Sequence, residues 1–459
     1  MFKAIANPNQ QTFFRLNPVT SEKASEASAL SVEQVSEMIG EADAAFRDWS
    51  LTAPAVKRDI MLRAAELLME RSAQLADCMV AETGTSRAWA EFNVKGSVNI
   101  LKEAAGLATH IKGETIPSNA PATITMTLRV PAGVCVGIAP WNAPLLLGLR
   151  AVVVPIVCGN TAILKASEQC PAVHYMIGEL LADAGLPKGV LHVVTHEAKD
   201  AAQIVETLVA HPAVKRVNFT GSTKVGRIIG ELAGKHLKPA LLELGGKAPF
   251  VVLKDADIVA AAKAAVFGAF MNHGQICMST ERLIVDESVA DAFSEELGRQ
   301  VAALKADGGL IGVGSADHVE ALVKDATSKG AKLVSSFTRD GVTIEPVVLD
   351  HVTTEMRVYA EESFGPVAPI VRVRSAEEAI RVANDTEYGL AAAVFGKDLE
   401  QTLRVAQAIE CGICNVNGAT VKSDSHVPFG GVKASGFGRF GGTAVINEFT
   451  DLKTVNIQI

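Results

Sequence analysis

Between residues 134 and 220, short β-branched apolar runs alternate with stretches of helical periodicity. This alternation predicts a parallel sheet, because a strand that returns beside its predecessor through a helix must run in the same direction. Helices are then expected on both faces of the sheet. The predicted strands are 134–139, 161–165, 190–194 and 214–220, and the predicted helices lie near 172–184 and 198–210, with a further helix starting at about residue 145.

The same alternation restarts after Glu243, which predicts a second α/β unit. Its first elements are a strand at 250–253, an Ala-rich helix at 258–272 and a strand at 282–285. Residues 31–110 instead carry helical periodicity throughout, with Ser31 as the expected N-cap. Residues 122–130 and 450–459 alternate polar and apolar side chains, as half-exposed strands do.

Length, charge and cysteine usage exclude several classes of protein. A chain of 459 residues is too long for one compact core. Its net charge of −8 argues against a nucleic-acid partner, which requires a basic face. Seven scattered cysteines, and a first fifteen residues without a long apolar run, indicate a reducing, cytoplasmic setting. The uncharged stretch 130–149 contains three prolines, so it is not expected to span a membrane.

Two segments mark out a thiol and a carboxylate. Cys277 follows Asn-His-Gly-Gln-Ile, and Glu243 lies in Leu-Glu-Leu-Gly-Gly-Lys247. Taken singly, a cysteine in an apolar chain is usually a buried small hydrophobe, and a Glu beside Gly-Gly is usually a turn residue. Cys411 and Cys414 have no second pair or histidine partners nearby, so packing is expected there and no metal site is predicted.

Further short blocks follow predicted strands, where parallel sheets bind ligands. The glycine turn after the strand 214–220 opens a helix and could receive a phosphate, although an ordinary strand-to-helix turn has the same pattern. The blocks are Pro-Trp-Asn-Ala-Pro at 140–144, Lys-Ala-Ser-Glu at 165–168, Thr-Gly-Ser at 220–222, Glu-Glu-Ser-Phe-Gly-Pro at 361–366 and Pro-Phe-Gly-Gly at 428–431.

In their order and content these blocks resemble those of the NAD(P)-dependent aldehyde dehydrogenases. The resemblance implies a doubly wound, Rossmann-like cofactor domain, a second α/β catalytic domain and a small β arm for oligomerisation into a homodimer or homotetramer. The implied ranges are 1–111 and 131–243 for the cofactor domain, 244–420 for the catalytic domain, and 112–130 with 440–459 for the arm.

The resemblance also implies roles for individual residues. Cys277 is the expected nucleophile, Glu243 the base that activates the deacylating water, and Asn142 a donor to the oxyanion. Glu168 favours NAD over NADP, because a carboxylate there repels a 2′-phosphate. The residues expected to contact the cofactor are Lys165, Glu168, Gly221, Ser222, Trp141, Gly245, Glu362 and Phe364.

The substrate expectation rests on positions that no motif fixes. Ala143 opens space near Asn142, Arg150 adds a charge, and Trp89 adds an aromatic surface, a combination that resembles the family's salicylaldehyde, vanillin and benzaldehyde dehydrogenases. Leu146 and Phe429 are expected to line the same tunnel. An aromatic aldehyde is therefore the predicted substrate, with an aliphatic aldehyde or a semialdehyde as the alternative. Arg150 could instead be a surface or interface salt-bridge residue, and Trp89 an ordinary core residue.

Two other classes of function use the same features differently. A cysteine hydrolase would pair the thiol with a histidine, and His273 is the nearest in sequence. A non-catalytic, crystallin-like protein would tolerate loss of the three catalytic residues, which are all present. One segment, 305–314, is shorter than is usual for the family, which leaves its local structure and any cation site nearby open.

Overall fold

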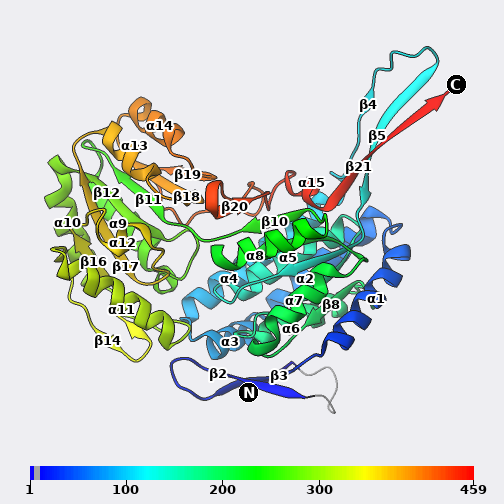
Figure 1. Ribbon diagram of the computed structural model, residues 1–459, viewed down its shortest axis with the longest axis horizontal. Helices are drawn as coiled ribbons and strands as arrows, with labels where there is room; N and C mark the ends of the chain where they lie inside the picture. The colour runs from blue at the N-terminus through cyan, green and yellow to red at the C-terminus, as the bar shows by residue number, and fades with distance from the viewer. Residues whose placement is uncertain (5–10) are drawn as a thin grey trace.

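The computed structural model describes residues 1–4 and 11–459, which form two α/β lobes with a β arm projecting from one side (Figure 1). The lobe nearer the chain's start contains a six-stranded sheet in the order β20-β10-β9-β6-β7-β8. All its neighbouring pairs are parallel except β10 with β20. Its strands are β6 (Val134–Ile138), β7 (Thr161–Lys165), β8 (Leu191–Val194), β9 (Val214–Thr220), β10 (Ala240–Glu243) and β20 (Gly436–Phe437).

Both faces of this sheet are buried, because successive side chains of one strand point to opposite helical layers. Val134 and Val136 of β6 pack with α1, α7 and α8, whereas Cys135 packs with the layer formed by α2 to α6. The predicted doubly wound fold is therefore confirmed. The helices are α1 (Val32–Trp49), α2 (Pro54–Glu70), α3 (Ser72–Thr83), α4 (Arg87–Leu107), α5 (Pro144–Val157), α6 (Pro171–Asp183), α7 (Ala201–Ala210) and α8 (Thr223–Lys235).

The second lobe contains a seven-stranded sheet in the order β13-β16-β17-β12-β11-β18-β19. Helices α9 and α10 cover one face and α13 and α14 the other. Helix α11 packs with α12 beside β16. The elements are β11 (Ala248–Val252), α9 (Ile258–Phe270), β12 (Thr280–Asp286), α10 (Glu287–Val301), α11 (Val313–Ser328), β13 (Lys332–Leu333), β16 (Val347–Asp350), α12 (Arg357–Ala360), β17 (Val367–Val373), α13 (Ala376–Asn384), β18 (Ala391–Phe395), α14 (Leu399–Ala408) and β19 (Ile413–Val416).

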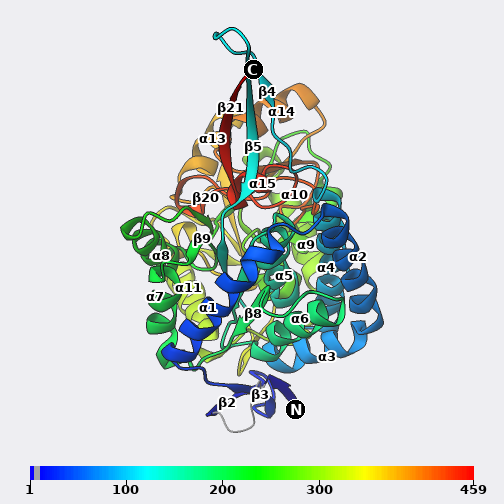
Figure 2. The ribbon, with the colours of Figure 1, turned by 90° about the vertical axis from the view of Figure 1, so that its right-hand side faces the viewer.

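The arm is a three-stranded antiparallel sheet that stands clear of both lobes (Figures 1 and 2). Strand β5 (Thr123–Pro131) pairs with β21 (Thr450–Gln458) along its whole length and with the short β4 (Thr115–Ile116). Strand β21 begins at Thr450, while the preceding α15 (Val445–Phe449) is buried against α5. A largely exposed sheet with no second layer is a surface that a partner chain can cover.

Two parts of the fold differ from the sequence prediction. A small sheet of β1 (Phe2–Ala4), β2 (Thr12–Leu16) and β3 (Lys23–Ser28) precedes α1 and was not predicted, because β1 and β2 are short and β3 is rich in Ala and Ser. The helix predicted at 258–272 ends at Phe270, because Asn272 and His273 have positive φ angles of 50° and 55°. Among the described residues, no helix is long and apolar enough to cross a membrane.

Candidate active site

The segment that carries Cys277 reverses direction immediately after α9. Asn272, His273 and Gly274 all adopt left-handed backbone conformations, with φ of 50°, 55° and 72°. Such conformations are unfavourable for side chains larger than glycine and persist where the surroundings enforce them. A Cβ on Gly274 would lie 2.2 Å from the carbonyl oxygen of Gly365, so only glycine fits there. The turn delivers Cys277 to the junction of the two lobes, directly before β12.

Glu243 ends β10 and has no exposed surface. Its carboxylate oxygens have no full hydrogen-bond partner among residues 1–4 and 11–459. Burial raises the pKa of Glu243 to about 7, while the charge of Arg150 and the thiol of Cys277 lower it in part. Burial, and then the charge of Glu243, raise the pKa of the Cys277 thiol above its usual range, whereas Arg150 lowers it. The predicted thiol and carboxylate are thus brought together, in an environment that favours their neutral forms.

Asn142 is held at the thiol by a network that the sequence does not reveal. Its side-chain Nδ2 donates to the backbone oxygen of Gln275 at 2.9 Å, two residues before Cys277. Its own backbone oxygen accepts from Trp89 Nε1 at 2.8 Å and from Asn272 Nδ2 at 3.2 Å. Since Nδ2 carries two hydrogens, one N–H remains for a negatively charged oxygen formed beside the thiol.

An apolar cluster lines the space next to Asn142. Ala143 and Leu146 from α5 and Trp89 from α4 contribute to it, and the Trp89 ring stacks on Phe92 with centroids 5.2 Å apart. The side chains come from four separate segments of the chain. The cluster consists of Trp89, Ala143, Leu147, Ile276 and Val421, with Leu146, Met271 and Met278 packed against it.

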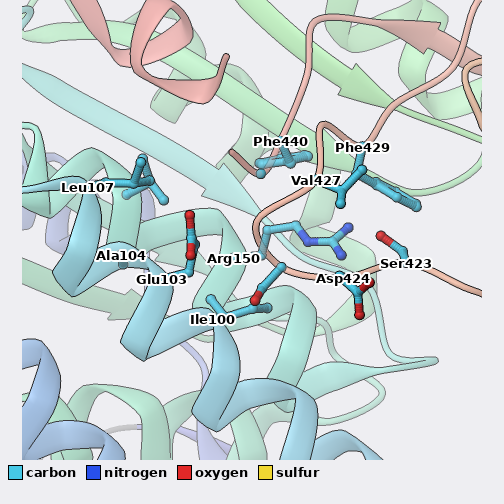
Figure 3. Close-up of a pocket in the computed structure, with 13 residues that line it drawn as sticks. Ile100, Glu103, Ala104, Leu107, Arg150, Ser423, Asp424, Val427, Phe429 and Phe440 are labelled. Carbon is cyan, nitrogen blue, oxygen red and sulfur yellow. The ribbon is translucent and has the colours of Figure 1, made fainter. Parts of the chain in front are cut away.

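Arg150 lies two turns of α5 after Asn142 and is held by aromatic rings. Its guanidinium sits 4.5 Å from the centroid of Phe429 and 5.6 Å from that of Phe440. It borders a cavity of about 30 Å³ shared with α4 and residues 423–427 (Figure 3). No described residue forms an ion pair or a hydrogen bond with it, so the surface salt-bridge alternative is not realised within this chain. Arg150 is therefore a cation with unused donors, and its charge is felt by Glu243 and Cys277.

The residues predicted to contact the cofactor gather at one edge of the six-stranded sheet. Lys165, Thr220 and Glu243 end neighbouring parallel strands, so their side chains project from the same edge. Lys165 Nζ lies 3.8 Å from Glu168 Oε2. The amide of Gly221 donates to the backbone oxygen of Glu243 at 3.0 Å, which ties the glycine turn to the carboxylate.

That glycine turn also begins a helix. Ser222 is the N-cap of α8, and its Oγ accepts a hydrogen bond from the amide of Val225 at 3.4 Å. The start of α8 presents backbone N–H groups and the positive end of the helix dipole, which are suited to a phosphate.

A second group of predicted cofactor residues joins the two lobes, since Trp141 and Gly245 follow β6 and β10 while Glu362 and Phe364 precede β17. The amide of Gly246 donates to Glu362 Oε1 at 2.8 Å, and a Cβ on Gly245 would lie 2.7 Å from Glu362 Oε2. Burial, and then Glu281, raise the pKa of Glu362 to about 7. Trp141 and Phe364 meet edge to face with centroids 5.8 Å apart. Buried carboxylates, glycine backbone and aromatic rings of this kind fit a dinucleotide with ribose hydroxyls and a planar ring.

His273 does not hydrogen-bond to Cys277. Its Nε2 lies 3.0 Å from the backbone oxygen of Asp307, so it fixes the shortened 305–314 segment. No described histidine hydrogen-bonds to the thiol. The thiol–histidine pair that a cysteine hydrolase requires is therefore not formed by the described residues. The two remaining cysteines singled out in the sequence, Cys411 and Cys414, pack against the cluster beneath α13 and α14.

Three residues of the site were missed in the sequence. Asn272 bonds both Asn142 and Thr85, whose Oγ1 donates to Asn272 Oδ1 at 2.7 Å. Lys247 and Glu281 form a fully buried ion pair behind the two catalytic segments. The one available signal was Lys247, which directly precedes a buried strand. A charge buried there requires a partner of opposite charge, because an unpaired charge is not tolerated in a core.

Comparison with known proteins agrees with this arrangement. Residues 5–455 match the Aldehyde dehydrogenase family, and the chain belongs to that family. It is 50% identical to a vanillin dehydrogenase of Pseudomonas sp. (strain HR199 / DSM 7063), covering 99% of this chain and 96% of the relative. It is 43% identical to a salicylaldehyde dehydrogenase of Pseudomonas putida, covering 99% and 96%.

The structural comparison gives the same family. The crystal structure of a salicylaldehyde dehydrogenase from Pseudomonas putida G7, complexed with salicylaldehyde, superposes with a TM-score of 0.98 at 42% identity, over 100% of this chain and 99% of that one. The protein is thus an aldehyde dehydrogenase in fold and in family.

Proposed function

We propose that this protein oxidises aromatic aldehydes to the carboxylic acids, with NAD as the hydride acceptor. The observation that carries the proposal is Arg150, a cation stacked on Phe429 and without an ion-pair partner among the described residues, whose charge acts on the Cys277 thiol. A ring hydroxyl or phenolate of an aromatic substrate would satisfy its donors. Relatives at 43% to 50% identity are named vanillin and salicylaldehyde dehydrogenases, which supports the same substrate class.

The chemistry follows from the placement of three side chains. The Cys277 thiolate attacks the aldehyde carbon, and the alkoxide accepts hydrogen bonds from Asn142 Nδ2 and the Cys277 amide. The cofactor, when bound, accepts the hydride, which leaves a thioester on Cys277. Glu243 then removes a proton from the water that releases the acid. A base with a pKa of about 7 suits this step, because it is ionised near neutral pH and still binds a proton well.

The choice of NAD rests on Glu168. Its carboxylate lies 3.8 Å from Lys165 at the end of β7, where an adenosine ribose is expected. The pair leaves little net positive charge for a 2′-phosphate. One relative at 38% identity is an NADP(+)-dependent succinate-semialdehyde dehydrogenase from Deinococcus radiodurans, so the two cofactors have to be compared directly.

Assembly through the arm is part of the same proposal. Strand β5 is long and half-exposed, and β21 lies beside it with most of its side chains in solvent. We propose a homodimer or homotetramer in which this sheet packs on a second copy. Size-exclusion chromatography with light scattering of the full chain tests it, and a monomer at micromolar concentration would contradict it.

The test of the substrate class is a panel of aldehydes with each cofactor. Salicylaldehyde, vanillin and benzaldehyde should give higher kcat/KM than acetaldehyde or succinic semialdehyde, and NAD should exceed NADP. Arg150→Ala should raise KM more for ring-hydroxylated aldehydes than for benzaldehyde. It should also move the pH–rate profile to higher pH, because the charge of Arg150 lowers the pKa of Glu243.

Arg150→Lys is the matched control, since it keeps the charge but not the planar fork. It should therefore leave the pH profile near its wild-type position while losing part of the discrimination between hydroxylated and plain rings. A higher kcat/KM for acetaldehyde, or an equal effect of Arg150→Ala on every aldehyde, would contradict the aromatic assignment.

A further inference from the structure

Lys247 and Glu281 form a buried ion pair at the point where the catalytic segments meet. Lys247 Nζ lies 2.7 Å from Glu281 Oε2, and the two side chains are 0% and 4% exposed. Lys247 directly precedes β11, and Glu281 is the second residue of β12, the strand paired with β11. The ion pair thus joins the starts of two neighbouring parallel strands at the centre of the second sheet.

Each member of the pair stands four residues after a catalytic residue. Lys247 follows Glu243, and Glu281 follows Cys277. Between them the two segments touch, because a Cβ on Gly246 would lie 2.5 Å from the backbone oxygen of Cys277. This backbone contact already holds the segment that carries the base against the segment that carries the thiol, and the ion pair lies just beyond it.

Glu281 also holds the loop that carries Glu362 and Phe364. Its Oε1 accepts from the amide of Phe364 at 3.0 Å, and its Oε2 accepts from the amide of Ser363 at 3.1 Å and from the Ser363 hydroxyl. Phe364 has a positive φ of 43°, which a bulky residue adopts only when its surroundings enforce it. The carboxylate of Glu281 supplies that enforcement, because both amide groups of the strained turn point at it.

Burial of such a pair is not explained by stability. Removing two charges from water costs about as much as their attraction returns, and apolar replacements of similar volume often fold at least as well. The acceptor sites of Glu281 are instead used to connect three segments, 243–247, 277–281 and 362–364. None of these contacts involves a residue whose side chain is expected to touch the aldehyde.

We infer that the Lys247–Glu281 ion pair is a positioning device that sets the nicotinamide half of the cofactor site, through Ser363 and Phe364, against the Cys277 thiol. The inference rests on the proposed NAD-dependent aldehyde oxidation. It assigns a role in hydride transfer to two residues that lie outside the contact surface of substrate and cofactor. Because hydride transfer requires close alignment of donor and acceptor, a misplacement of about 1 Å is expected to cost about a hundredfold in rate.

The consequence is a separation of two activities of the same thiol. Hydrolysis of an activated ester such as p-nitrophenyl acetate needs Cys277 and Glu243 but no hydride acceptor. Oxidation of an aldehyde needs the aligned cofactor as well. Loss of the positioning contact should therefore slow the hydride step and leave ester hydrolysis largely intact, whereas a general loss of structure lowers both.

The experiment compares Glu281→Gln, Ser363→Ala and the control Asp350→Asn with wild type. Glu281→Gln keeps the size of the side chain and removes the charge that Lys247 requires. Ser363→Ala removes one hydrogen bond to Glu281 and leaves the ion pair in place. It therefore still tests the positioning contact if Glu281→Gln folds poorly. Asp350 pairs with Arg372 at 2.7 Å in the same sheet, away from the three segments, and controls for the loss of a partly buried ion pair.

Stopped-flow measurement of the NADH burst with salicylaldehyde and NAD gives the hydride step, and p-nitrophenyl acetate hydrolysis gives the thiol chemistry. We expect the burst rate to fall about ten- to hundredfold in Glu281→Gln and less in Ser363→Ala, with ester hydrolysis near wild type in both. In Asp350→Asn the two activities should change together. An unchanged burst in both site variants, or a parallel loss of both activities in Ser363→Ala, overturns the inference. A wild-type protein that hydrolyses the ester but oxidises no aldehyde would instead refute the proposed function.

Discussion

Replacing Glu243 by glutamine should stabilise the protein at alkaline pH while abolishing sustained turnover. The carboxylate has no exposed surface and no full hydrogen-bond partner among the described residues, and burial raises its pKa from 4.5 to about 7. Each pKa unit corresponds to about 1.36 kcal/mol, so keeping Glu243 ionised in the folded state costs roughly 3 kcal/mol. Glutamine has nearly the same shape and no charge, and therefore avoids this cost.

The sign of the pH dependence follows from proton binding. A carboxyl group whose pKa is higher in the folded state retains its proton there between pH 4.5 and about 7, while the unfolded chain has lost it. The wild type therefore loses stability as pH rises through this window, and Glu243→Gln does not. The difference in free energy of unfolding should be near zero at pH 4.5 and should approach roughly 3 kcal/mol above pH 7.

Urea unfolding followed by the fluorescence of the three tryptophans, at several pH values, measures this difference. Glu296→Gln is the matched control, because hydrogen bonds from Arg299 and Gln300 lower the pKa of that partly buried carboxyl and its replacement should not stabilise. A stability difference independent of pH, or a Glu243→Gln variant less stable than wild type at pH 8.5, would refute the reasoning. The same burial that lowers the stability of the fold gives Glu243 a pKa suited to a general base.

Four further outcomes are expected at the same site. Glu243→Gln should produce one burst of NADH per active site and then stall, as rapid mixing can show; loss of the burst itself would mean that Glu243 activates Cys277 or positions the cofactor. Cys277→Ala should abolish NADH formation and leave NAD binding nearly unchanged in a fluorescence titration, so retained turnover would exclude Cys277 as the nucleophile. Asn142→Ala should lower kcat about 10²- to 10³-fold by removing an oxyanion donor, and a fall confined to KM would contradict that role. Trp89→Phe should lower kcat about fivefold, since it removes one hydrogen bond of about 1 kcal/mol to the Asn142 backbone but keeps the aromatic surface; an unchanged kcat would show that Asn272 alone is sufficient.

The sequence was sufficient for the two α/β units and the arm, and for singling out the thiol and the carboxylate that are proposed to react. The alternation of β6, β7 and β9 with helices fixes a parallel sheet, because local periodicity and chain direction leave few other arrangements. The cysteine and glutamate blocks were recognisable because each is a contiguous stretch that resembles a block of the aldehyde dehydrogenases. Strands β5 and β21 were predicted from their period of two, although they lie more than 300 residues apart.

Only the tertiary structure decided how those groups are held and charged. The indole of Trp89 reaches the backbone of Asn142 across 53 positions, and Glu281 reaches Phe364 across 83. The sequence left Arg150 open as a surface salt-bridge residue, and only the packed chain places its guanidinium against Phe429 and Phe440. The pKa of Glu243 likewise depends on burial, which is a property of the packed chain. Local pattern specifies which residue can react, whereas proximity and desolvation, which arise only on folding, determine where it points and at what pH it is ionised.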